Sequence, residues 1–234
     1  MNVFAISDLH ISGDGAKPMD VFGGKWVGYL PKIVVDWNKK VSDDDVVLIC
    51  GDISWAMNLP DAIRDLSLIT PLKGKKVLIR GNHDYWWKSI SQIRAALPCG
   101  FYALQNDCVK FGNKIICGSR GWCVEGSPDF KEQDRKIYLR ETERLKLALS
   151  AAEKVRENGD EIYCMVHFPP FNARRENSLF TDLFESKGVS KVIYGHLHGS
   201  DSRADLKIVK NGVEYYLTSC DQVNNELTLI GEFL

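Results

Sequence analysis

All five histidines of the chain stand at or just after the ends of predicted strands. They are His10, His83, His167, His196 and His198. Active sites of sheet-based folds gather at the carboxyl ends of strands, so polar residues placed there converge in space. Histidines with only structural roles would not segregate in this way. The pattern therefore predicts one site that uses several imidazole groups.

Oxygen ligands accompany these histidines. Asp8 stands two residues before His10, and residues two apart in an extended segment point the same way. Asp52 follows the second predicted strand, and Asn82-His83 follows the third. Each piece alone has a structural alternative, because Asp and Asn are also common turn residues. Together, carboxylate, amide and imidazole without thiolate indicate a metal site rich in oxygen and nitrogen ligands.

The strands that position these residues are short apolar runs rich in β-branched side chains. We predict strands over 3–6, 46–50, 77–79, 115–117, 162–166 and 191–194. Helical periodicity predicts helices over 31–40, 60–69, 87–97 and 130–158, the last with an apolar stripe of Leu139, Leu145, Leu149 and Ala152. A hairpin with an Asn-Gly turn is expected over 206–217, and a final strand over 226–233. This order predicts two packed mixed sheets with helices outside.

The series of motifs along the chain resembles that of the calcineurin-like metallophosphoesterase superfamily, in the manner of a bacterial-type phosphohydrolase. The matching motifs are Asp8-x-His10, Gly51-Asp52, Gly81-Asn82-His83-Asp84, His167 and Gly195-His196-x-His198. The resemblance implies an α/β fold, a four-layer α/β/β/α sandwich of two mixed sheets with a dinuclear metal site at the strand ends. We expect a single domain over residues 1–234.

The resemblance also implies ligand roles. One metal would be held by Asp8, His10, Asp52 and His198, and the second by Asp52, Asn82, His167 and His196. Asp52 would bridge two divalent ions, with manganese as the first candidate and iron, zinc or cobalt left open. The expected reaction is attack of a metal-bridging hydroxide on phosphorus, in line with the leaving group.

The same resemblance places His83 beside the leaving group, as the candidate general acid. A structural alternative is that His83 only orients Asp84. In the protein serine/threonine phosphatase branch, an aspartate three residues after the bridging aspartate pairs with this histidine, whereas Trp55 occupies that position here. This departure argues against a phosphoprotein phosphatase of that branch. Asp84 itself is expected to orient a ligand from behind.

The charge balance bears on the substrate. With 30 basic and 31 acidic residues, the formal net charge is -1. Proteins that hold a nucleic-acid backbone usually carry a basic excess. We therefore expect a small phosphorylated substrate, either a phosphodiester or a phosphomonoester, with a nuclease as the alternative. A non-catalytic metal-bound scaffold for protein partners is less well supported, because no candidate ligand is missing.

Arg174 and Arg175 are candidate substrate-binding residues, since a guanidinium group can bind phosphate through two hydrogen bonds. Arg120 is a similar candidate, and a solvated surface charge is the alternative for each. Residues 11–30, rich in glycine, could cover the site as a lid or form plain surface. Loop tryptophans, Trp55 among them, could stack on a base or serve as packing anchors.

Composition favours a soluble chain in the cytoplasm. The N-terminus runs straight into an apolar strand without a basic start, and no apolar run approaches the length of a membrane span. Seven cysteines without a C-x-x-C pair indicate reduced thiols. Cys50, Cys117 and Cys164 lie in apolar runs and are expected to be buried.

Overall fold

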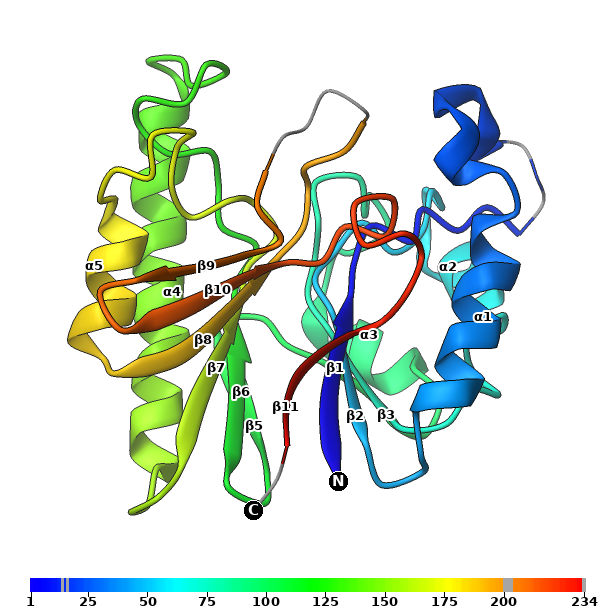
Figure 1. Ribbon diagram of the computed structural model, residues 1–234, viewed down its shortest axis with the longest axis horizontal. Coiled ribbons are helices and arrows are strands. Elements are labelled where there is room, and N and C mark those ends of the chain that lie inside the picture. The colour runs from blue at the N-terminus through cyan, green and yellow to red at the C-terminus, as the bar shows by residue number, and fades with distance from the viewer. Residues whose placement is uncertain (14, 16, 200–203, 233–234) are drawn as a thin grey trace.

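The short β-branched runs form two mixed sheets that pack against each other (Figure 1). The computed structural model describes residues 1–13, 15, 17–199 and 204–232. The first sheet has the order β11-β1-β2-β3-β4, from β1 (Asn2–Ile6), β2 (Val46–Ile49), β3 (Lys75–Leu78), β4 (Phe101–Ala103) and β11 (Thr228–Glu232). The second has the order β5-β6-β7-β8-β10-β9, from β5 (Asp107–Phe111), β6 (Lys114–Gly118), β7 (Glu161–Met165), β8 (Val189–Tyr194), β9 (Lys207–Lys210) and β10 (Val213–Leu217).

Helices cover the outer face of each sheet, which confirms the predicted four-layer sandwich (Figure 1). The first sheet is covered by α1 (Tyr29–Lys40), α2 (Leu59–Leu66) and α3 (Ile90–Ala96). The second is covered by α4 (Asp134–Val155) and α5 (Leu179–Ser186). Two short 3₁₀ helices, η1 (Met19–Phe22) and η2 (Gly24–Trp26), lie between β1 and α1.

Strands buried on both faces explain the continuous apolar runs in the sequence. Alternate residues of β1 and β2, such as Ala5 and Leu48, point toward the second sheet and meet Met165 and Ile193 there. The intervening residues point toward the helices. The side chains of Ala5, Leu48, Met165 and Ile193 are fully buried. Because one face of each sheet packs on the other sheet, the carboxyl ends of the central strands of both sheets lie at a common edge.

Several elements differ from the sequence prediction. β4, β5 and α5 were not predicted, and the long helix starts at Asp134 and ends at Val155 rather than spanning 130–158. The apolar stripe of that helix contains Leu145, Leu149 and Ala152, but Leu139 is 46% exposed and was wrongly included.

The last predicted strand corresponds to β11, and its predicted end at residue 233 lies outside the described residues. Cys50, Cys117 and Cys164 are buried free thiols as expected. In the described ranges, none of the helices combines the length and the apolar character that crossing a membrane requires.

Candidate metal centre

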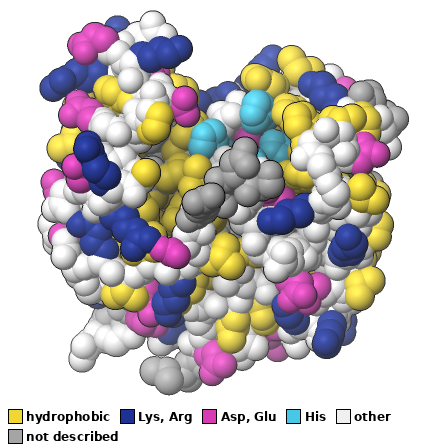
Figure 2. Space-filling view, turned by 45° about the horizontal axis from the view of Figure 1, so that its top comes forward, with side chains coloured by type: hydrophobic (Ala, Val, Ile, Leu, Met, Phe, Trp, Pro, Cys, Tyr) yellow, Lys and Arg dark blue, Asp and Glu magenta, His cyan; other side chains and the backbone are white. Residues whose placement is uncertain are grey.

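The candidate ligands come together at the carboxyl ends of β1, β2, β3, β7 and β8. Asp8 and His10 follow β1, Asp52 follows β2, Asn82 follows β3, His167 follows β7, and His196 and His198 follow β8. Histidine side chains gather in a hollow between two raised parts of the surface (Figure 2). The seven residues predicted as ligands thus lie on adjoining loops of both sheets.

The backbone around these ligands adopts conformations that are uncommon for residues other than glycine. Asp8, His10, Asp52 and His196 have φ values of 59°, 45°, 50° and 72°. Asp and His tolerate this left-handed region better than most residues, but holding them there still costs free energy. Such strain persists only where surrounding contacts fix it. The loops therefore trade local stability for the direction of these side chains.

On one side of the centre, Asn82 lies between two imidazoles. Its Oδ1 is 2.7 Å from His167 Nε2 and 2.9 Å from His196 Nδ1. His167 Nε2 is also 3.5 Å from Asp52 Oδ2. One nitrogen or oxygen from each of these four residues thus points at a common region.

On the other side, Asp8 faces His198 and Asp52 faces His10. His198 Nε2 is 3.1 Å from Asp8 Oδ1, and His10 Nε2 is 3.8 Å from Asp52 Oδ2. Asp8 also lies close to the other half, with Oδ1 3.9 Å from His167 Nδ1. Ligand atoms within 4.8 Å of one another form two sets among the described residues, Asp8–His10–His198 and Asp8–Asp52–His167.

The donor set fits a cation because lone pairs face lone pairs. His167 Nδ1 is 2.9 Å from the carbonyl oxygen of Cys50, which can only accept, so the proton of a neutral His167 ring is on Nδ1. Nε2 then presents a lone pair to the carbonyl oxygen of Asn82, another acceptor. Nδ1 of the buried His10 has no hydrogen-bond partner among the described residues. Two facing acceptors and an unpartnered ring nitrogen are the surroundings that a divalent cation satisfies.

Burial and neighbouring charges set the ionisation of the metal-free centre. Burial lowers the pKa of His10 and of His196 to about 3, so both rings are neutral, as ligands must be. Burial raises the pKa of Asp52 to about 7. Burial lowers the pKa of His198, but the carboxylates of Asp8 and Asp221 together raise it by more. The resulting pKa is about 10. Burial would raise the pKa of Asp8, yet His198 and His167 bring it below its ordinary value.

Asp84 ties two ligand loops together, which agrees with its predicted role behind the ligands. One carboxylate oxygen accepts from the backbone N–H of Ile53 at 2.9 Å and from Trp86 Nε1 at 3.0 Å. The other accepts from the N–H of Gly81 at 2.7 Å. Asp84 is fully buried. It therefore fixes the loop of Asp52 relative to the loop of Asn82.

His83 lies beside the ligands, at the end of the centre nearest Trp55. Its backbone N–H donates to Asp52 Oδ1 at 2.7 Å. Its ring packs against Trp55, with ring centroids 4.7 Å apart, and its Nδ1 is 3.5 Å from the hydroxyl of Tyr85. Burial lowers the pKa of His83 below its ordinary value. Trp55 thus occupies the place of an acidic partner and contacts the ring through its indole face.

Asp221 belongs to this site although the sequence analysis did not identify it. Its Oδ1 is 2.8 Å from His198 Nδ1, and its Oδ2 accepts from the N–H of Gly199 at 2.9 Å. It follows β10, which pairs in parallel with β8 and so ends at the same edge. A carboxylate on the far nitrogen of a ligand histidine orients the ring and fixes its tautomer. The pattern "Asp just after a strand" was the available signal.

The predicted substrate arginines are exposed and paired with acids. Arg174 Nε is 3.2 Å from Glu176 Oε1, and Arg175 forms an ion pair with Asp205. Their role in substrate binding stays a prediction. Arg120 packs over the ring of Trp122 at 4.6 Å and also pairs with the buried Glu141.

Among the described residues of the segment over 11–30, Trp26 contacts two ligand rings of the centre. Trp26 is buried, and its ring lies 6.0 Å from that of His10 and 5.5 Å from that of His198. Residues 14 and 16 of the predicted lid lie outside the described residues. The described part forms a wall of the centre, and whether it closes over a substrate stays a prediction.

Comparisons with known proteins agree with this geometry. The family model for calcineurin-like phosphoesterases matches residues 1–200. A protein of unknown function from Aquifex aeolicus shares the fold, with 16% identity, a TM-score of 0.52, and 97% of this chain and 95% of that chain covered. The phosphopantetheinyl hydrolase of Mycobacterium tuberculosis does so with 13% identity, a TM-score of 0.54, and 98% and 95% covered. No curated protein matches the sequence.

Proposed function

The chain belongs to the calcineurin-like phosphoesterase family, and from this premise we propose that it hydrolyses a phosphodiester or phosphomonoester of a small molecule with two divalent metal ions. Phosphoester hydrolysis that depends on metal follows from the family. The number of ions, manganese as the first candidate, and the small substrate are the proposed part. The near-neutral charge of the chain supports a small substrate over a nucleic acid.

One observation carries the proposal. The lone pairs of His167 Nε2 and Asn82 Oδ1 face each other at 2.7 Å, beside the carboxylate of Asp52. With a neutral His167 ring and no cation this arrangement is repulsive, and the contact of His167 Nδ1 with the carbonyl oxygen of Cys50 maintains it from behind. Facing acceptors of this kind support a metal-binding role over a structural one.

In the proposed centre the ligands form two sets on either side of Asp52. Asp8, His10 and His198 would hold one ion, and Asn82, His167 and His196 the other, with Asp52 between them. Two divalent ions held by these residues would lower the pKa of bound water and withdraw charge from phosphoryl oxygens. The chain itself keeps the acceptors aimed and excludes bulk water from buried Asp8 and His167.

His83 is the proposed general acid. Its backbone N–H bonds to Asp52, so its ring stays within reach of a phosphoryl group at the centre. A proton delivered from the protonated ring to the leaving oxygen lets an alcohol depart in place of an alkoxide, and because the pKa of His83 is lowered, this form gains population as the pH falls. Trp55 and Tyr85 hold the ring by packing and by hydroxyl contact, respectively.

The test measures hydrolysis of bis-p-nitrophenyl phosphate and p-nitrophenyl phosphate with added Mn²⁺, with chelator, and in an Asp52→Asn variant. We expect Mn²⁺-dependent turnover, lost with chelator and reduced by about 10³-fold in the variant, the size of effect seen when a preorganised charged group is removed. Asp44→Asn is the matched control, because Asp44 is exposed and lies outside the centre. A chain that binds no divalent ion in equilibrium dialysis would contradict the proposal.

A further inference from the structure

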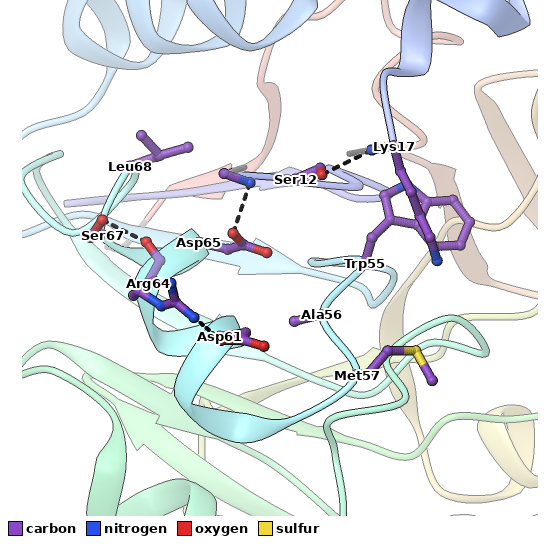
Figure 3. A pocket seen from close by; sticks show the side chains of 11 residues that line it. Ser12, Lys17, Trp55, Ala56, Met57, Asp61, Arg64, Asp65, Ser67 and Leu68 are labelled. Atoms are coloured by element: carbon purple, nitrogen blue, oxygen red, sulfur yellow. Dashed lines mark hydrogen bonds and ion pairs between the residues drawn. The ribbon is translucent and has the colours of Figure 1, made fainter. Parts of the chain in front are cut away.

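A cavity of about 470 Å³ lies beside the metal centre, and we name it the Trp55 pocket. It is lined by residues 12–13 and Lys17, by residues 55–57, and by part of α2 and the turn that follows it. Trp55 and Lys17 stand on one side, and Asp61, Asp65 and Leu68 on the other (Figure 3). Its volume is within the range of pockets that bind small molecules.

The indole of Trp55 is a wall shared by the pocket and the metal centre. The ring stacks on His10, with centroids 4.7 Å apart and planes at 22°. It also contacts His83 at 4.7 Å. Only the Trp55 side chain therefore separates a phosphoryl group at the metal centre from this side of the pocket. The group bonded to the leaving oxygen, which must pass His83, begins at the edge of this ring.

The carboxylates of the pocket are already engaged. Asp65 accepts from Ser54 Oγ at 2.5 Å and from the N–H of Gly13 at 2.8 Å. Asp61 forms an ion pair with Arg64 and accepts from Asn58 Nδ2 at 2.7 Å. These acids hold the pocket walls together and leave little capacity to bind a cationic ligand.

Lys17 is differently placed. Its ammonium group lies 4.8 Å from the centre of the Trp55 ring, and it forms no ion pair with a carboxylate among the described residues. An ammonium over an aromatic face has part of its hydration replaced by the ring and stays able to bind an anion. The pocket thus offers its one uncompensated cation beside its one aromatic face, counting the described residues.

The remaining wall is apolar. Met57 is 60% exposed and Leu68 is 44% exposed, and both line the pocket. Large exposed apolar side chains around a cavity beside a catalytic centre favour contact with an apolar part of a ligand. A flat ring can meet both these side chains and the Trp55 edge.

We propose that the Trp55 pocket binds the ester group of the substrate, and that this group is a planar ring with an anionic substituent. The ring contacts Trp55, Met57 and Leu68, and the anion pairs with Lys17. This inference rests on the proposed function, because it concerns the substrate of that reaction. The pocket itself does not depend on a bound metal. Specificity would then come from α2, residues 12–13 and Lys17, while the chemistry stays on the other side of the indole.

Binding is tested with 4-carboxyphenyl phosphate, phenyl phosphate and methyl phosphate, by NMR of the Trp55 indole N–H in the full chain, without metal and with Zn²⁺. The signal is assigned with Trp55→Phe. We expect both aryl compounds to shift this signal and to bind at least about tenfold more tightly than methyl phosphate, the gain from burying about half a ring or more. Lys17→Met should weaken 4-carboxyphenyl phosphate about fivefold and leave phenyl phosphate unchanged.

Leu68→Trp fills the pocket and should abolish the preference for aryl compounds. Leu147→Trp is the matched control, because Leu147 is 61% exposed on α4. Equal binding of aryl and methyl phosphate, or an aryl preference that survives Leu68→Trp, would overturn the proposal. Hydrolysis of the same compounds with Mn²⁺ separates the two hypotheses. A binding preference without hydrolysis of any ester would keep the pocket and reject the proposed function.

Discussion

The metal centre and the Trp55 pocket lie on two sides of one indole ring but are built differently. In the centre, Asp8, Asp52 and His167 are buried and fixed by hydrogen bonds from neighbouring loops. In the pocket, Met57 and Leu68 are exposed and can change rotamer freely. The metal centre therefore depends on exact backbone geometry, whereas the pocket depends on the size and charge of a few side chains.

The largest expected effect tests this dependence on the backbone. A Cβ added at Gly81 would lie 2.8 Å from Asp52 Cγ and still closer to the backbone nitrogen of Asp52. We expect Gly81→Ala to displace Asp52, to lower kcat/KM by more than about 100-fold, and to lower the free energy of unfolding by about 1–3 kcal/mol, as overpacking does. Steady-state kinetics measures kcat/KM, dialysis measures the metal content that depends on Asp52, and urea unfolding measures the free energy of unfolding.

Gly24→Ala is the control, since a Cβ there meets no atom within 4 Å. It should change the free energy of unfolding by less than about 0.5 kcal/mol. Unchanged metal content and activity in Gly81→Ala would show that the centre tolerates backbone shifts. The centre would then not differ from the pocket in its dependence on backbone geometry.

The next effect concerns Asp221, which supports His198 from behind. In Asp221→Asn the amide can turn its NH₂ toward His198 Nδ1 and favour the wrong tautomer. We expect metal affinity, measured by calorimetry, to fall about 10–100-fold, as for other residues that orient ligand histidines. Glu226→Gln is the control, because that side chain is 64% exposed. Equal affinity in both variants would mean that packing alone orients His198.

The pH dependence of metal binding comes third. In the metal-free chain the pKa of His198 is raised to about 10, so the ring carries a proton that a metal must displace. The pKa of Asp52 is about 7, so this carboxyl group also holds a proton at lower pH. Above pH 7 one proton is displaced, and affinity should rise about tenfold per pH unit; below pH 7 it should rise more steeply.

Calorimetry in two buffers of different ionisation enthalpy counts the released protons. A metal affinity that stays constant from below to above pH 7 would contradict the ionisation of His198 and Asp52 described above. The Lys17→Met variant should show the same pH profile as the unmodified chain, because the pocket takes no part in metal binding.

The strands, and the position of the candidate ligands at strand ends, could be predicted from the sequence because both depend on local pattern. Runs such as 46–50 are apolar throughout, and only a buried strand of that length explains them. His167 and His196 follow such runs directly, so the sheet edge brings them together. α5 was missed, although Ser178 and Thr181 form its capping box.

Asp221 and the Trp55 pocket could not be derived in the same way. The Asn211-Gly212 turn predicts the antiparallel pairing of β9 and β10, but only the parallel pairing of β10 with β8 places Asp221 beside His198. The pocket joins Lys17 to Leu68 across loops whose contacts have no periodic signal. Loop-to-loop contacts are a tertiary property, and a single sequence does not encode them in a readable pattern.

The smallest predicted effect concerns the link between the first residue of α1 and the centre. The hydroxyl of Tyr29 donates to the carbonyl of Leu9 at 2.7 Å and lies 3.2 Å from that of His10. Tyr29→Phe removes this bond, and we expect the free energy of unfolding to fall by about 1 kcal/mol, with metal affinity changed by less than about fivefold. Tyr102→Phe is the control, since Tyr102 is 37% exposed. A loss of metal affinity as large as in Asp221→Asn would show that the start of α1 holds the ligand backbone, so that α1 and the centre act as one unit.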